Sequence, residues 1–116
     1  MKKKNIQRID ASKILAPVSR DEAFHFHTDF GAYTEKFATS LVNFCEMLEI
    51  IDLKAIEFHV EREDFEKWIR HLGDYTLAAQ VGKLRERKIK GEDLRRKLIE
   101  IIKRRINKLR SMLRQS

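Results

Sequence analysis

The sequence predicts an α+β domain in which a small two-stranded, βαβ-like sheet packs with about four helices, the last of them long and basic. Its 116 residues suffice for one domain with a single core. Two short segments alternate apolar and polar residues with the two-residue period of a strand, and the other apolar residues recur mainly at helical spacing. One proline and four glycines leave few long loops.

The first 20 residues show no periodicity and carry six basic side chains against one acidic side chain. They predict a basic, flexible arm. A single α+β domain is expected to follow over residues 21–116.

A first strand is expected at residues 23–27, with Phe24 and Phe26 on one side and two histidines on the other. A turn follows at residues 28–31. From Ala32 to Ile51 apolar residues recur at steps of three and four, which predicts the best core helix of the chain.

A second strand is expected at Ala55–Val60, where Ile56, Phe58 and Val60 alternate with other residues. A strand, a connection that holds a helix and a second strand favour a right-handed βαβ unit. The sequence leaves open whether the two strands are neighbours.

Three helical segments complete the chain. The first covers residues 61–72 and ends at Gly73, the residue type that favours a helix C-terminus. Asp74 is expected to cap the second. The third covers residues 92–114, and its two acidic residues at the start complement the helix dipole.

Several residues stand at spacings that recur in a known family: Ile56-Glu57-Phe58-His59, Arg62, Asp64-Phe65, Trp68-Ile69 and Gly73-Asp74. From Phe24 to Leu84 the chain resembles small prokaryotic domains without an assigned activity, found chiefly in hyperthermophilic archaea. The resemblance implies a compact domain and supplies no reaction or site. Scarce Asn and Gln beside plentiful Lys, Arg and Glu also resemble a hyperthermophilic composition.

Charge is distributed unevenly along the chain, whose net charge is +7. Residues 1–20 carry +5, residues 21–82 carry −8 and residues 83–116 carry +10. This asymmetry favours a polyanion as the partner of the basic third, or a second copy that docks its basic third against the acidic middle.

The basic helix is the leading candidate site. One side forms an apolar stripe, and the other exposes cations suited to a phosphate backbone, with Glu100 as the only interruption. The predicted nucleic-acid-binding residues are Lys83, Arg87, Lys88, Arg96, Lys97, Lys103, Arg104, Lys108, Arg110 and Arg114. The alternative is a solvated face of a highly charged protein.

Self-association is the second hypothesis. Arg95 and Arg105 fall within the apolar sector of the last helix, so they must reach outward or meet acidic groups, in this copy or another. A homodimer could form through the sheet edge, or through the acidic middle against the basic helix.

A small metal-dependent enzyme is the third hypothesis. If the two predicted strands paired, His25, His27, Glu57 and His59 would share one face and could hold zinc or iron. The alternative is the polar side of a half-exposed sheet. Lone Cys45 lies in an apolar helical pattern, which predicts a buried, inert thiol.

No phosphate-binding glycine loop or catalytic triad pattern occurs. We therefore expect a non-enzymatic, cytoplasmic accessory protein of RNA or a ribosomal subunit, with no cofactor. A membrane is not expected, because no apolar run approaches about 18 residues. The residues do not distinguish RNA from DNA.

Overall fold

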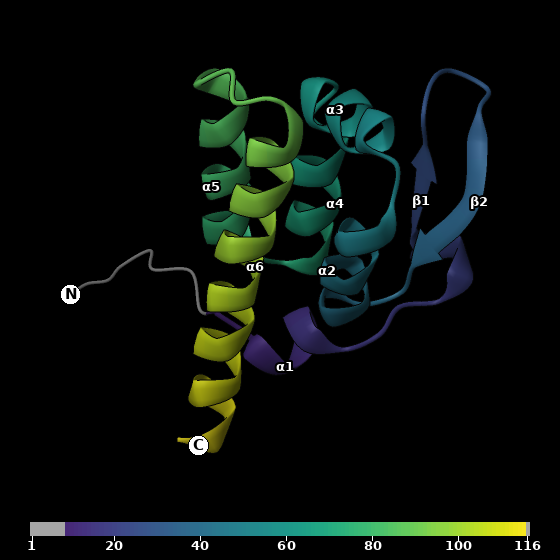
Figure 1. Cartoon of the computed structure of the whole chain (residues 1–116). Coiled ribbons are helices and arrows are strands. Elements are labelled where there is room, and N and C mark those ends of the chain that lie inside the picture. The colour runs from purple at the N-terminus through teal and green to yellow at the C-terminus, as the bar shows by residue number, and fades with distance from the viewer. Residues whose placement is uncertain (1–8, 116) are drawn as a thin grey trace.

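The computed structural model describes residues 9–115 as an α+β arrangement of helices around one core, with a two-stranded sheet at one side (Figure 1). The elements in chain order are α1 (Ala11–Leu15), a 3₁₀ turn (Arg20–Glu22), β1 (Phe24–His27), β2 (Tyr33–Ala38), α2 (Leu41–Ile50), α3 (Leu53–Glu61), α4 (Asp64–Leu72), α5 (Tyr75–Glu86) and α6 (Gly91–Arg114).

The sheet is an antiparallel hairpin of β1 and β2. Gly31 takes a positive φ of 72° in the turn, as the sequence suggested for this segment. The register shifts between His25 and His27, and Glu35 on β2 takes a φ of 67°, which marks a bulge. The sheet packs on α2 and α3, so Phe24 and Phe26 are buried.

The hairpin corrects the prediction of a βαβ unit. The strand expected at residues 55–60 is instead α3, whose buried side chains are two adjacent pairs four residues apart. Asp52 starts this helix, because its side chain accepts a hydrogen bond from the Lys54 N–H at 2.9 Å. Over six residues the two-residue and the helical patterns share several apolar positions, so alternation alone could not separate them.

The predicted core helix from Ala32 to Ile51 is right only in its second half. Its first half is β2, and α2 begins after Ser40, whose hydroxyl accepts a hydrogen bond from the Asn43 N–H at 3.0 Å. This cap satisfies a free N–H of the first turn and fixes the helix start there.

The later helices confirm the prediction closely. Gly73 ends α4 with a φ of 106°, and the Asp74 side chain caps α5 by accepting from the Leu77 N–H at 3.0 Å. Residues 62–63 separate α3 from α4, so α4 starts later than expected.

Helix α6 packs against four of the other helices. It contacts α1, α2, α3 and α5, and its last turns run beside α1, away from the sheet (Figure 1). The side chain of Ile14 on α1 is buried, so the segment that follows residue 8 is part of the core and not a free arm. Residues 1–8 of the predicted arm lie outside the described residues.

Candidate nucleic-acid interface and histidine pocket

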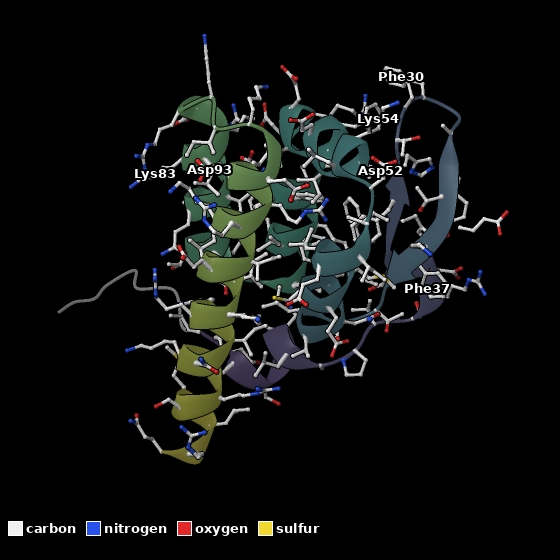
Figure 2. The ribbon with its side chains drawn as sticks, viewed as in Figure 1. Phe30, Phe37, Asp52, Lys54, Lys83 and Asp93 are labelled. Atoms are coloured by element: carbon white, nitrogen blue, oxygen red, sulfur yellow. The ribbon has the colours of Figure 1, made fainter. Side chains whose placement is uncertain are left out.

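The predicted basic residues gather on α5, the α5–α6 turn and α6. We call this set the basic surface, and within it only Lys97 is half-buried while the others are exposed. Figure 2 shows Lys83, at one end of the set, on the opposite side of the molecule from Lys54. Lys83 therefore lies on the side of the molecule away from the sheet.

Few carboxylates neutralise this surface. Arg96 pairs with Asp93 one turn earlier, and Lys103 Nζ lies 3.3 Å from a carboxylate oxygen of Glu49 on α2. Within residues 9–115, none of the other cations of the basic surface forms an ion pair.

The cations of α6 follow two flanks of the helix. Residues seven apart lie almost two turns apart on the same side, which aligns Arg96, Lys103 and Arg110. That flank borders α2 and its glutamates, with Lys103 and Arg110 lining one groove. Lys97 and Arg104 define the other flank, together with Lys108. The second flank is thus the one with the least compensated charge.

The two arginines of the apolar sector find partners inside the same chain. Arg105 donates to both carboxylate oxygens of Asp74, at 2.7 and 3.0 Å, and Asp74 is buried. Arg95 donates to the carbonyls of Leu48 and Ile51 at the end of α2, both at 2.8 Å. The sequence left open whether the partners lie in this copy or another, and both arginines find partners within this chain.

The histidine cluster comes together only in part. His59 on α3 lies beside β1, where its Nε2 accepts a hydrogen bond from the His27 N–H at 2.8 Å. Its Nδ1 lies 2.8 Å from Asp64 Oδ2. Because the backbone N–H must donate, Nε2 is unprotonated and Nδ1 donates to Asp64. Both ring nitrogens are therefore occupied, and this His–Asp pair has no free basic nitrogen for a substrate.

Burial disfavours the protonated form of the His59 imidazole. His59 is 3% exposed, and desolvation lowers its pKa, opposed in part by the hydrogen bond and charge of Asp64. A neutral ring matches its role as an acceptor for the β1 backbone.

The other two residues of the proposed metal set lie elsewhere. His25 Nδ1 lies 3.0 Å from the Tyr33 hydroxyl, and its Nε2 lies 3.1 Å from the Arg20 carbonyl. Glu57 accepts from the Gly91 N–H at 2.8 Å, at the start of α6. Residues 9–115 contain no group of three or more His, Cys, Asp or Glu side chains placed to hold a metal ion. The four residues do not share a face, because α3 is a helix.

A pocket of about 520 Å³ opens between the hairpin turn, α3 and α4. We call it the hairpin pocket. Arg62 pairs with Asp64 at 3.0 Å, and Trp68 is nearly buried and donates to the Glu22 carbonyl at 2.8 Å. The sequence did not single out Phe30 or Lys67. The one sequence feature that could have indicated this pocket was a phenylalanine, Phe30, in a predicted turn.

The buried thiol of Cys45 agrees with the sequence analysis. It is 3% exposed, and desolvation raises its pKa. Among residues 9–115, no helix has the length and apolarity needed to cross a membrane.

Comparison with known proteins gives one match. A search of curated proteins and a search of solved structures found nothing similar. A family of unknown function, DUF5752, matches residues 5–103, which include the whole hairpin pocket and end within α6. The chain belongs to the DUF5752 family.

Proposed function

We propose that the protein is a non-enzymatic, RNA-associated accessory protein that binds the phosphate backbone through the basic surface. The observation that carries this proposal is the flank of Lys97, Arg104 and Lys108, which has no acidic partner within residues 9–115. Each cation that neutralises a phosphate releases counterions, so such a flank binds nucleic acid without reading bases.

The internal ion pairs support this reading over a merely solvated surface. Arg85, Arg95 and Arg105 are matched by buried or neighbouring acceptors, and they stabilise the fold. Among the exposed cations of the basic surface, only Arg96 and Lys103 pair with a carboxylate within residues 9–115. An RNA partner accounts for the cations that have no acidic partner. The more specific proposal is that this RNA belongs to a ribosomal subunit.

The test is binding of a fluorescently labelled, mixed-sequence RNA by the purified chain, followed by anisotropy. We expect Arg104→Glu with Lys108→Glu to weaken binding by at least about tenfold, because two attractive charges become repulsive. The control is Lys36→Glu with Lys54→Glu, two exposed residues on β2 and α3. It makes the same change in net charge on another side of the molecule.

Equal loss in both double variants would reject the site, because net charge alone would then explain binding. No binding by the unmodified chain would reject the function. In that case a stable dimer in sedimentation equilibrium would favour the self-association hypothesis.

The ribosomal form has its own test. We expect the protein to sediment with a ribosomal subunit in a sucrose gradient at low salt and to leave it at high salt. Migration at the top of both gradients would exclude the ribosome as the partner. The anisotropy experiment would then decide whether the protein binds other RNA.

A further inference from the structure

The hairpin pocket brings charged donors over a floor of aromatic rings. Phe24 of β1, Phe58 of α3 and Trp68 of α4 line it, and Phe30 stands at its edge in the hairpin turn. Figure 2 places Phe30 at the tip of the hairpin. The Phe30 side chain is 75% exposed, although the centre of its ring lies 5.4 Å from the centre of the Phe58 ring.

Arg62 is held in a fixed position at this edge. Its guanidinium carbon lies 4.8 Å from the Phe30 ring centre and 5.2 Å from that of Phe58. Its Nε donates to Asp64 at 3.0 Å. These contacts leave the two terminal nitrogens without a hydrogen-bond partner among residues 9–115, so a pair of donors at the pocket is available to a ligand.

Lys67 is a second cationic donor in the pocket. Lys67 forms no ion pair in the described part of the chain. His27 donates its Nδ1–H to the His25 carbonyl at 3.2 Å, so in the neutral ring Nε2 is an acceptor and offers no hydrogen bond to an anion. The His59 ring is fully engaged.

We propose that the hairpin pocket binds a small organic anion, a phosphate monoester or a carboxylate on a flat apolar body. Arg62 and Lys67 would hold the oxyanion, and the aromatic floor would contact the body. A cavity of about 520 Å³ has the size of sites that take small ligands. This site is separate from the basic surface, and its test does not depend on RNA.

Trp68 supplies the readout, because it is the only tryptophan of the chain and it lines the pocket. We would titrate the full chain with phenyl phosphate, benzoate, inorganic phosphate and benzyl alcohol while following tryptophan fluorescence. Phenyl phosphate or benzoate should give a saturable change, and the stronger of the two identifies the oxyanion. Inorganic phosphate and benzyl alcohol should each bind at least about tenfold more weakly, since each lacks one half of the ligand.

Variants place the ligand in the pocket. Arg62→Gln and Lys67→Gln should each weaken binding by about tenfold, the usual effect of removing a charged hydrogen-bond donor. Asp29→Asn should strengthen it, because Asp29 is a carboxylate that lines the same pocket. The control Lys54→Gln, on α3 but outside the pocket, should leave affinity unchanged.

Absence of a saturable change with both aromatic anions would overturn the proposal. So would equal binding of benzyl alcohol, which would make the pocket merely apolar. Because Lys67 forms no ion pair within residues 9–115, Lys67→Gln tests the charge without disturbing the Arg62–Asp64–His59 contacts.

Discussion

His59 should make the stability of the protein depend on pH. Its lowered pKa means that the unfolded chain takes up a proton before the folded protein does. The free energy of unfolding is then highest above the ordinary histidine pKa of about 6.5 and decreases as the pH falls below it. Protonation also turns Nε2 into a donor that faces the His27 N–H.

Urea denaturation between about pH 7.5 and 5 should show a decrease of up to about 1.4 kcal/mol per pH unit from this one group. His59→Gln should flatten that slope, whereas His71→Gln, at an exposed position, should retain it. A slope that survives in His59→Gln would assign the effect to other groups.

Loss of the Asp74 side chain should destabilise the protein strongly. Asp74 is 1% exposed, caps α5 and is the counter-ion of Arg105, whose side chain is only 10% exposed. Asp74→Ala removes both roles and should cost about 3–5 kcal/mol, because Arg105 is left buried without a partner. Asp74→Asn keeps a cap acceptor and should cost less.

The matched control is Asp93→Ala, which removes the exposed partner of Arg96. An exposed pair contributes about 0–1 kcal/mol, so this variant should unfold at nearly the urea concentration of the parent. Similar losses at positions 74 and 93 would contradict the importance of burial.

At the scale of elements, two helices end in the same geometry with different residues. In α4 the Gly73 N–H donates to the Arg70 carbonyl and the next N–H to Ile69. In α5 the Lys88 N–H donates to the Arg85 carbonyl and the next N–H to Leu84. Both are Schellman ends, which need a left-handed residue, and Lys88 takes a φ of 58°.

Replacement at these two ends should therefore have opposite effects. Lys88→Gly should raise stability by about 0.5–1 kcal/mol, because glycine adopts this conformation without strain. Gly73→Ala should lower it by a similar amount, although a Cβ there meets only ordinary contacts, the nearest at 3.6 Å. Thermal unfolding measures both, and a loss of stability in Lys88→Gly would contradict the strain at this position.

The order of the elements was predictable where a cap stands in the sequence. Gly73 and Asp74 fixed the boundary between α4 and α5, and both were recognised. Asp52 and Ser40 are caps of the same kind, but the spacing of the apolar residues overrode them. Phe37 continues the step of four to Leu41, so β2 looked like the start of α2.

The basic surface and the hairpin pocket were predictable from the sequence to different extents. The basic surface follows from local spacing on α6 and from the cations just before it, and every member lies at an exposed or half-buried position. The hairpin pocket depends on Phe30 reaching Phe58 across the fold, a contact that no local pattern encodes. The Arg105–Asp74 pair spans 31 residues, and sequence predicted the need for a partner but not its identity.

At the scale of the whole molecule, charge separation along the chain becomes separation in space. The acidic middle forms the hairpin, α2, α3 and α4, while the basic third extends along α6 on the other side (Figure 1). The 24 residues of α6 make a rod of about 36 Å, long enough to contact several successive phosphates. Binding through such a rod should respond to salt in proportion to the phosphates it contacts.

We therefore expect the logarithm of the RNA association constant to fall linearly with the logarithm of the salt concentration. Neutralising two contacting cations, in Arg104→Gln with Lys108→Gln, should reduce that slope by about 1.4–1.8, since each contact contributes about 0.7–0.9. Lys36→Gln with Lys54→Gln should leave the slope unchanged. A slope that shifts equally in both would mean that the field of the whole molecule attracts RNA, and that no particular flank of α6 touches it.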